Sequence, residues 1–174
     1  PEELDTSLSG ILFNQVPHQV DTVRLLGGGK VKTVCSATGI WDASRATEGS
    51  HFTFLEFEDG AAASLVYSGY DHFDSDEFNG WVGEGGQIRS SDQHGRNRRS
   101  LAEVKSQEEE TALRTSTYAY KGLGERSGSE PEQHQPRFGV MVVSCEDGDM
   151  RPTADGINIY TQDGVREMPI VAGR

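Results

Sequence analysis

The hydrophobic pattern of this chain changes period once, from a helical repeat to a pattern typical of β-strands. Four apolar side chains recur at three- and four-residue spacing and so share one face of a helix: Val16, Val20, Val23 and Leu26 or Leu25. Glycines at 27–29 follow, and glycine readily takes the left-handed conformation that ends helices. Pro17 suits the first turn of a helix, where its missing N–H is not needed. We therefore expect a short lead-in and then one helix between residues 10 and 29.

After this helix, the sequence reads as short strands joined by tight turns. Runs rich in β-branched or aromatic residues cover 31–38, 51–57, 61–69, 78–88, 138–145, 156–160 and 165–168. Asp-Gly pairs at 59–60 and 163–164 supply the positive φ angles that hairpin turns require. Within 51–57, the spacing predicts that Phe52, Phe54 or Leu55, and Phe57 share one face.

Six to eight hairpin-joined strands with little helix predict the α+β class. We expect an open, mostly antiparallel sheet with one or two helices on one face, in a single domain of residues 1–174. A second copy of the molecule, or a further segment, would cover the other face. Residues 90–136 are polar, and we expect a charged surface helix over 100–113 within a long excursion or a disordered loop.

Charge and composition exclude several classes of partner. The formal net charge is −12, which opposes binding to nucleic acid or to an anionic membrane. There is no apolar run of the ~20 residues that a membrane helix needs, and the first residues do not resemble a secretory signal. Cys35 and Cys145 lie in apolar runs outside any disulfide or CxxC pattern, so we expect two buried free thiols and a cytoplasmic location.

The glycine-rich and acidic segments match no cofactor or metal motif. The glycines at 27–29 follow a helix instead of preceding one, and 83–87 and 122–124 lack the spacing of a dinucleotide fingerprint. The stretch 70–77 mixes one histidine with four acids, but its spacing matches no EF-hand or zinc site. We predict no metal site and interpret 70–77 as a solvated acidic turn. The arginines at 96, 98 and 99 are interpreted as a solvated loop.

The densest polar group lies on the first helix. Asn14, His18 and Asp21 are spaced to share a helix face, and an imidazole oriented by an amide or a carboxylate suits proton transfer. The alternative is structural: Asn14 caps the helix, His18 is a half-buried surface residue, and Asp21 pairs with Arg24.

A second group, 41–45, follows a predicted strand, where binding groups are common. Arg45 could hold a substrate carboxylate through its two-pronged guanidinium, and Tyr70 could add a hydroxyl. The alternative for Arg45 is a solvent-facing loop tip.

Several segments together resemble one enzyme family. Residues 10–21, GILFNQVPHQVD, resemble the G-x-L-x-D-x-x-x-H-x-x-D segment of the Gfo/Idh/MocA oxidoreductases. The runs GIWD at 39–42, FEDGAAA at 57–63, YSGYDHF at 67–73 and VSCE at 143–146 strengthen the likeness. Together they resemble the branch of phthalate 4,5-cis-dihydrodiol dehydrogenases.

The resemblance implies an NAD(P)-dependent dehydrogenase that oxidises a cis-dihydrodiol carboxylate. It implies that an N-terminal Rossmann domain, with the glycine fingerprint and a catalytic lysine, precedes Pro1, and that a closing helix follows Arg174. This piece alone would then be inactive and hold no cofactor-binding residue of its own. The family also implies a homodimer or tetramer formed through the sheet face.

By the same resemblance, His18 falls on the family's catalytic histidine and Asp21 on an acid near the substrate. Asn14 falls where many members carry Asp; an amide cannot accept a proton, but it can orient the substrate hydroxyl. Arg45 and Tyr70 are added because a dicarboxylated substrate needs cationic or hydroxyl partners. Two alternatives remain: the same scaffold acting on a sugar or polyol, and a non-catalytic module that dimerises through its sheet, which the Asn14 departure favours.

Overall fold

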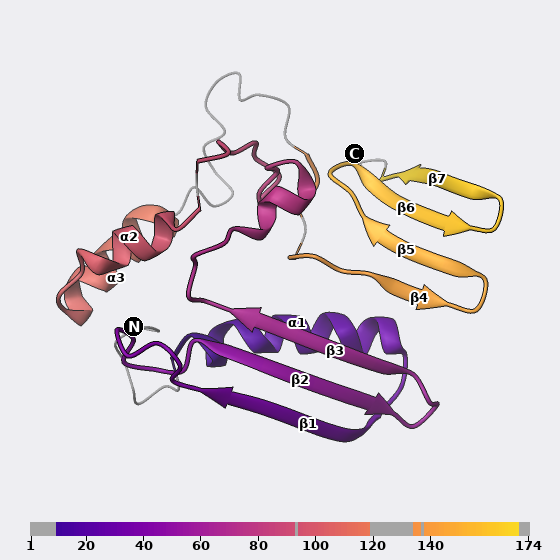
Figure 1. The fold of residues 1–174 in the computed structure, drawn as a ribbon, viewed down its shortest axis with the longest axis horizontal. Helices are drawn as coiled ribbons and strands as arrows, with labels where there is room; N and C mark the ends of the chain where they lie inside the picture. The colour runs from indigo at the N-terminus through magenta and orange to yellow at the C-terminus, as the bar shows by residue number, and fades with distance from the viewer. Residues whose placement is uncertain (1–9, 93, 119–133, 137, 171–174) are drawn as a thin grey trace. The chain divides into compact units, whose positions relative to one another are not determined.

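The computed structural model describes residues 10–92, 94–118, 134–136 and 138–170. These residues confirm the α+β class, with helices and antiparallel strands in open sheets (Figure 1). The chain divides into two compact units, one of Pro1–His72 with Arg96–Gly122 and one of Phe73–Gly95 with Leu123–Arg174. The seven strands of the described residues accordingly form a three-stranded and a four-stranded sheet, where a single sheet was expected.

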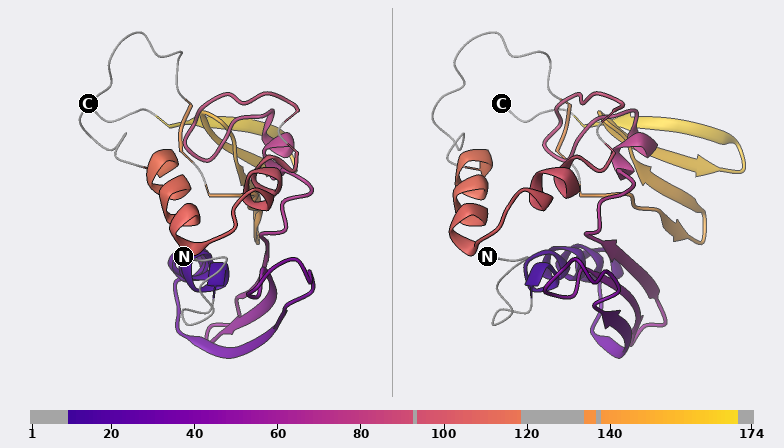
Figure 2. Two further views of the ribbon diagram at one scale, coloured as in Figure 1. Left: turned by 90° about the vertical axis from the view of Figure 1, so that its left-hand side faces the viewer. Right: turned by 60° about the vertical axis from the view of Figure 1, so that its left-hand side comes forward.

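In the first unit, one helix lies across one face of an antiparallel sheet (Figures 1 and 2). Helix α1 (Gly10–Gly27) packs over the strands of the sheet ordered β1-β2-β3. The strands are β1 (Val31–Gly39), β2 (Ser50–Phe57) and β3 (Ala62–Ser68). All three therefore match the strands expected at 31–38, 51–57 and 61–69 to within a residue at each end.

The core of this unit lies between α1 and the sheet. Leu55, Leu65 and Phe57, which is only 1% exposed, form a buried cluster against Val20 and Val23 of the helix. Burial of this apolar area is the main source of stability for such a layer. It confirms that Val20 and Val23 of the apolar repeat face the core, whereas Leu26 at the end of the repeat is 51% exposed.

Of the residues expected to share a face of β2, Leu55 and Phe57 do so, but the expectation that Phe52 and Phe54 join Phe57 is wrong. Successive side chains of a strand alternate between faces, so Phe57 and Leu55 point toward α1 while Phe52 and Phe54 lie on the opposite face. There Phe52 is 52% and Phe54 46% exposed. The sheet thus carries an apolar outer face, defined here by Trp41, Phe52, Phe54 and Val66.

Helix α1 begins earlier than Pro17 suggested. It starts at Gly10, so Pro17 lies inside the helix and the prediction of a first-turn proline is wrong. A proline there removes one intrahelical hydrogen bond, and the packing of Val20 and Val23 against the core compensates for it. At the other end, Gly28 has φ +69° and its N–H donates to the carbonyl of Arg24 at 3.1 Å, which closes the helix as expected.

A chain of hydrogen bonds that passes through the buried His51 also joins α1 to the sheet. His51 on β2 is 2% exposed; its Nε2 lies 2.9 Å from Gln19 Oε1, and its Nδ1 lies 2.8 Å from Thr53 Oγ1. Gln19 donates its amide N–H to the carbonyl of Val66 at 3.1 Å, so its oxygen must accept from His51. Nε2 therefore carries a proton, and Nδ1 lies beside the Thr53 hydroxyl, which lies 2.7 Å from that of Ser36. Burial lowers the pKa of His51, which favours the neutral imidazole with Nδ1 as the acceptor from Thr53.

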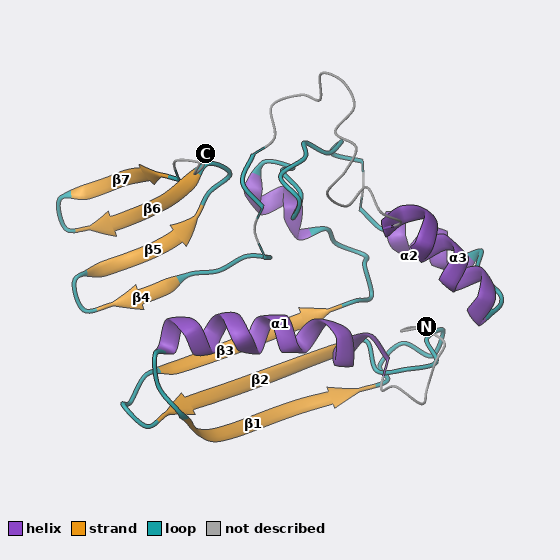
Figure 3. Ribbon diagram, turned by 180° about the vertical axis from the view of Figure 1, so that it is seen from behind, coloured by secondary structure: helices purple, strands orange, loops and turns teal. Residues whose placement is uncertain are grey.

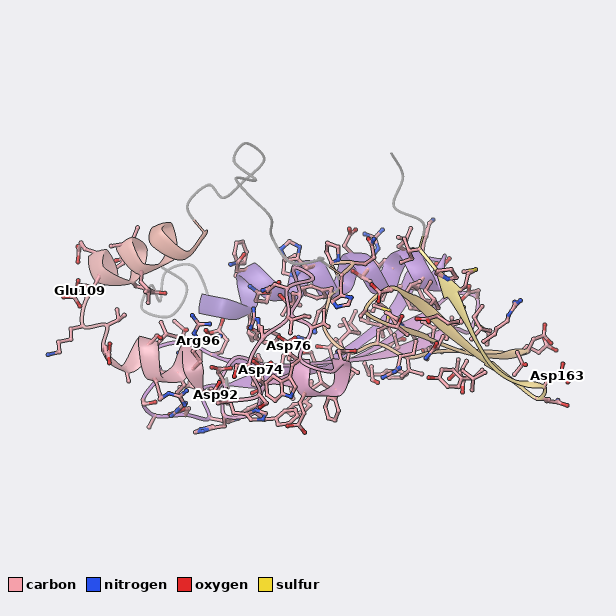
Figure 4. All side chains as sticks on the ribbon, turned by 90° about the horizontal axis from the view of Figure 1, so that it is seen from above. Asp74, Asp76, Asp92, Arg96, Glu109 and Asp163 are labelled. Atoms are coloured by element: carbon pink, nitrogen blue, oxygen red, sulfur yellow. The ribbon has the colours of Figure 1, made fainter. Side chains whose placement is uncertain are left out.

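The second unit contains an antiparallel meander, β4-β5-β6-β7 (Figure 3). Its strands are β4 (Val143–Cys145), β5 (Gly148–Pro152), β6 (Gly156–Thr161) and β7 (Gly164–Pro169). Asp163 lies at the tip of the β6–β7 turn, as the Asp-Gly signal predicted (Figure 4).

The hairpin expected over 78–88 is not formed. The 3₁₀ helix η2 (Ser75–Asn79) occupies its start, and Val82 and Ile88 make a single β-bridge. Asp74 caps η2 by accepting the N–H of Asp76, and Arg89 lies 3.4 Å from the Asp76 carboxylate (Figure 4). The repeated glycines of this segment favour such turns over paired strands.

The polar stretch at 90–136 contains two helices, α2 (Arg96–Ala102) and α3 (Gln107–Tyr118), where one was expected over 100–113. The expected excursion or disordered loop at 119–133 lies outside the described residues.

Among the described helices, none is long and apolar enough to cross a bilayer. Cys35 and Cys145 are free thiols as predicted, but both are exposed, so the expectation of burial is wrong.

A substitution at Gly27 tests the packing of α1 on Phe57. A Cβ there would meet the Phe57 ring at 2.7 Å. Alanine favours helix by up to about 1 kcal/mol, but overpacking typically costs about 1–3 kcal/mol. Because Phe57 is fully buried, we expect Gly27→Ala to lower the free energy of unfolding, measured by urea denaturation of the intact protein. In a double-mutant cycle, Phe57→Leu should reduce that loss. Gly28→Ala, which meets no neighbour, should lose about 1 kcal/mol from its left-handed conformation alone, with no coupling to Phe57.

The buried His51 predicts a pH dependence of stability. Burial lowers the pKa of His51 below its ordinary value of 6.5. Below about pH 6.5 the unfolded chain therefore binds a proton at this residue that the folded chain does not bind, so stability falls as the pH falls. We expect His51→Gln to reduce the difference in unfolding free energy between pH 8 and pH 5.5. An equal difference in wild type and variant would contradict this assignment.

Candidate functional site

Asn14, His18 and Asp21 lie together on the face of α1 that points away from the sheet. At 3.6 residues per turn they fall within an arc of about 60°, opposite the stripe that holds Val20 and Val23. His18 and Asp21 are exposed and Asn14 is half-buried. The core contact of α1 therefore directs this polar face outward, which leaves the imidazole accessible.

The structural alternative for this group does not hold. Asn14 lies in the second turn of α1 and does not cap it. His18 is exposed instead of half-buried, and no ion pair joins Asp21 to Arg24 within the described part of the chain. Helix capping by Asn14 and an ion pair between Asp21 and Arg24 therefore do not explain this group.

The loop after β1 is held by an arginine from far along the sequence. Arg98 on α2 donates to the Asp42 carboxylate at 2.5 Å, to the carbonyl of Tyr70 at 3.2 Å and to the hydroxyl of Ser44 at 3.3 Å. Its backbone N–H donates to Asp71 at 3.1 Å. The hydrogen bond from Arg98, with those from Ser44, holds the pKa of Asp42 well below its usual range. Asp42 is therefore an anion that fastens this loop.

Tyr70 and Arg45 lie at the same end of the sheet. The Tyr70 hydroxyl accepts the N–H of Trp41 at 2.9 Å and donates to the carbonyl of Gly39 at 3.4 Å, and its ring fills the space that a side chain at Gly49 would need. Arg45 is half-buried and donates to the carbonyl of Gly69 at 3.2 Å. Arg45 is thus not a solvent-facing loop tip, and both side chains brace the loop between β1 and β2 against the end of β3.

A hollow of about 690 Å³ opens between the first half of α1 and strands β1 and β2. Its helix side is apolar, while the strands contribute hydroxyl groups and the His51 ring. The lining residues are Leu12, Phe13, Val16, Pro17, Val20, Ser36, Thr38, Gly39, Ile40, Glu48, His51 and Thr53. His18 does not line this hollow. The exposed imidazole of His18, which was expected to take part in catalysis, and the buried imidazole of His51 therefore lie on different sides of α1.

Sequence reasoning missed three polar residues of this unit. Arg98 was interpreted as part of a solvated loop, and His51 and Gln19 were not singled out. Their partners lie 56 and 32 residues away in sequence, and no local motif encodes such contacts. The described residues hold no cluster of three or more histidine, cysteine or acidic side chains that could bind a metal ion.

Comparison with known proteins identifies the family. The profile of the GFO/IDH/MocA C-terminal domain matches residues 3–89, half of the chain. A 1-carboxy-3-chloro-3,4-dihydroxycyclohexa-1,5-diene dehydrogenase of Comamonas testosteroni is 38% identical over 160 residues, which cover 91% of this chain and 40% of that protein.

A solved structure gives the same result. The crystal structure of a protein from Bordetella bronchiseptica RB50, provisionally called a dehydrogenase, is 44% identical with a TM-score of 0.82. The match covers 99% of this chain and 44% of that one. The chain therefore spans less than half the length of each of these relatives. Together, the matched profile and the shared fold show that the chain belongs to the Gfo/Idh/MocA family and carries its C-terminal domain.

Proposed function

We propose that this chain is the substrate-binding and oligomerisation domain, residues 1–174, of an NAD(P)-dependent dehydrogenase that oxidises a cis-dihydrodiol carboxylate. The observation that carries the proposal is the exposed face of α1, where His18 is accessible between Asn14 and Asp21. The name of the Comamonas relative, a dehydrogenase of a dihydroxycyclohexadiene carboxylate, supports the substrate class. A cytoplasmic enzyme of aromatic breakdown fits this chemistry.

The cofactor would be held mainly by another domain of the same protein. This sequence contains no glycine fingerprint for a dinucleotide, so we propose an N-terminal Rossmann domain as the partner of this chain. An exposed imidazole on α1 fits that arrangement, because it can contact a substrate that the Rossmann domain holds against the nicotinamide ring. When bound, NAD or NADP supplies the hydride acceptor.

In the proposed reaction, His18 acts as the general base. It takes the proton of one substrate hydroxyl while the hydrogen on the same carbon leaves as hydride. The ketone so formed can tautomerise: the carbon that bears the second hydroxyl loses its proton, the ketone oxygen gains one, and the ring becomes aromatic, which makes the oxidation favourable. The Asn14 amide orients the reacting hydroxyl, and the Asp21 carboxylate accepts a hydrogen bond from the second one.

The carboxylate of the substrate needs a cation. Arg45 is the candidate, because it is half-buried beside the β1–β2 loop and guanidinium groups bind carboxylates through paired hydrogen bonds. Tyr70 would contribute from the same end of the sheet, where its hydroxyl already bridges Trp41 and Gly39.

The outer face of the sheet supports an oligomer. Val66 is 59% exposed, and Phe52 and Phe54 lie beside it with the Trp41 ring 5.7 Å from that of Phe52. An exposed aromatic cluster of this kind marks an interaction site more often than a solvated surface. We propose that a second copy of the protein covers it.

Replacing His18 tests the reaction. We expect His18→Ala in the intact enzyme to lower kcat by about 10²–10⁴ with a cis-dihydrodiol carboxylate and either nicotinamide cofactor, because a general base is lost. His72→Ala, which removes another exposed imidazole, should leave kcat unchanged. Faster turnover of sugars or polyols than of dihydrodiols would replace the substrate class, and full activity of His18→Ala would remove the proposed role.

A charge on the outer face tests the oligomer. We expect Phe54→Asp to shift the intact protein toward a smaller species in sedimentation experiments, because a carboxylate buried at an interface has no partner. Val165→Asp, at another exposed apolar position on β7, serves as the control and should leave the assembly unchanged. An unchanged assembly in Phe54→Asp would contradict an interface at this face.

A further inference from the structure

We infer that Gln19 and His51 position the imidazole of His18, by fixing where α1 lies on the sheet. The inference rests on the proposed function, since it concerns the placement of the general base. Neither residue touches the exposed polar face of α1. They act from the side of the helix that meets the sheet, through the hydrogen bonds that Gln19 makes to β2 and β3.

These hydrogen bonds fix the helix in a way that its apolar contacts do not. Val20 and Val23 meet Phe57, Leu55 and Leu65 through apolar surface, and such contacts have no preferred direction. The Gln19 amide instead accepts from His51 Nε2 at 2.9 Å and donates to the Val66 carbonyl at 3.1 Å. Because hydrogen bonds require both distance and angle, one side chain tied to two strands limits sliding and rolling of α1.

The His51 ring is itself held in one state. It is 2% exposed, and Thr53 occupies its other nitrogen at 2.8 Å. The Thr53 hydroxyl in turn meets that of Ser36 on β1. Burial of the ring in the sheet thus orients the donor that faces Gln19, and the Thr53 hydrogen bond adds stability at the far nitrogen.

His18 is the neighbour of Gln19 in the same helix, so a movement of α1 displaces the backbone of both residues by the same amount. With its side chains, an α-helix has a radius of about 5–6 Å, so a roll of about 10° moves a side-chain tip by about 1 Å. A displacement of that size can cost about 10²-fold in rate when it misplaces a reacting group. Loss of the link is thus expected to lower kcat more than it raises KM.

Variants of His51 separate the two nitrogens of the ring. Glutamine carries an N–H about where Nε2 lies and can keep the link to Gln19, whereas asparagine reaches only the position of Nδ1. In the intact enzyme, we expect His51→Gln to keep kcat within about threefold of wild type. His51→Asn should lower kcat by about tenfold or more, with KM changed by less than about threefold.

Two further variants distinguish positioning from stability. Gln19→Met keeps the length of a half-buried helical side chain, removes the link, and should lower kcat as His51→Asn does. Thr53→Val removes the hydrogen bond at the far side of the ring but keeps the link, so it should lower the unfolding midpoint while kcat stays within about threefold. If His51→Asn does not fold, the comparison of Gln19→Met with Thr53→Val decides.

The outcomes are distinct. Wild-type kcat in Gln19→Met, or an equal loss of kcat in Thr53→Val and Gln19→Met, would overturn the positioning role. If His18→Ala also keeps full activity, the proposed function fails and this inference fails with it. Loss of activity in His18→Ala beside full activity in Gln19→Met would overturn the inference alone.

Discussion

The packing of Phe57 against α1 decides what each surface of the first unit can do. Its ring occupies the space beside Gly27 and meets the apolar stripe of the helix, so the stripe has to face the sheet. Helix geometry then turns His18 and its neighbours outward, because they lie half a turn away from that stripe. The same constraint, through strict alternation along β2, places Phe52 and Phe54 on the outer face. One buried aromatic contact thus separates a polar helix face from an apolar sheet face.

Local sequence predicted the strands of the first sheet and the β6–β7 hairpin well, but it missed β5, and it predicted the faces less well. Strand ends and turns were predicted because Asp-Gly pairs and β-branched runs act over a few residues, as in β2 and β3. The prediction of the buried face of β2 was wrong because large apolar residues lie on both faces of this strand. Hydrophobicity alone therefore does not show which set of alternate residues is buried. Pro17 was misplaced for a related reason. Its position inside α1 depends on tertiary packing, whose stabilisation exceeds the cost of one lost hydrogen bond. The preference of proline for the first turn of a helix does not take tertiary packing into account.

The candidate site shows the same division. The grouping of Asn14, His18 and Asp21 follows from their spacing on one helix, so the sequence alone was enough to find it. The roles of His51 and Arg98 depend on contacts between segments that only the fold brings together. Arg98 illustrates the physical reason: a basic residue in a polar stretch reads as solvated unless the chain places a carboxylate such as Asp42 beside it.

The amide at position 14 is compatible with a base on this helix face. A carboxylate there would favour the imidazolium ion over the neutral imidazole, and only the neutral ring can accept a proton in the direction of oxidation. Asn14 keeps a hydrogen-bonding group at the position without adding that charge. In a chain of net charge −12, one fewer carboxylate on this face also lessens the repulsion of a carboxylated substrate. The departure from the family pattern is therefore compatible with the proposed oxidation of an anionic dihydrodiol.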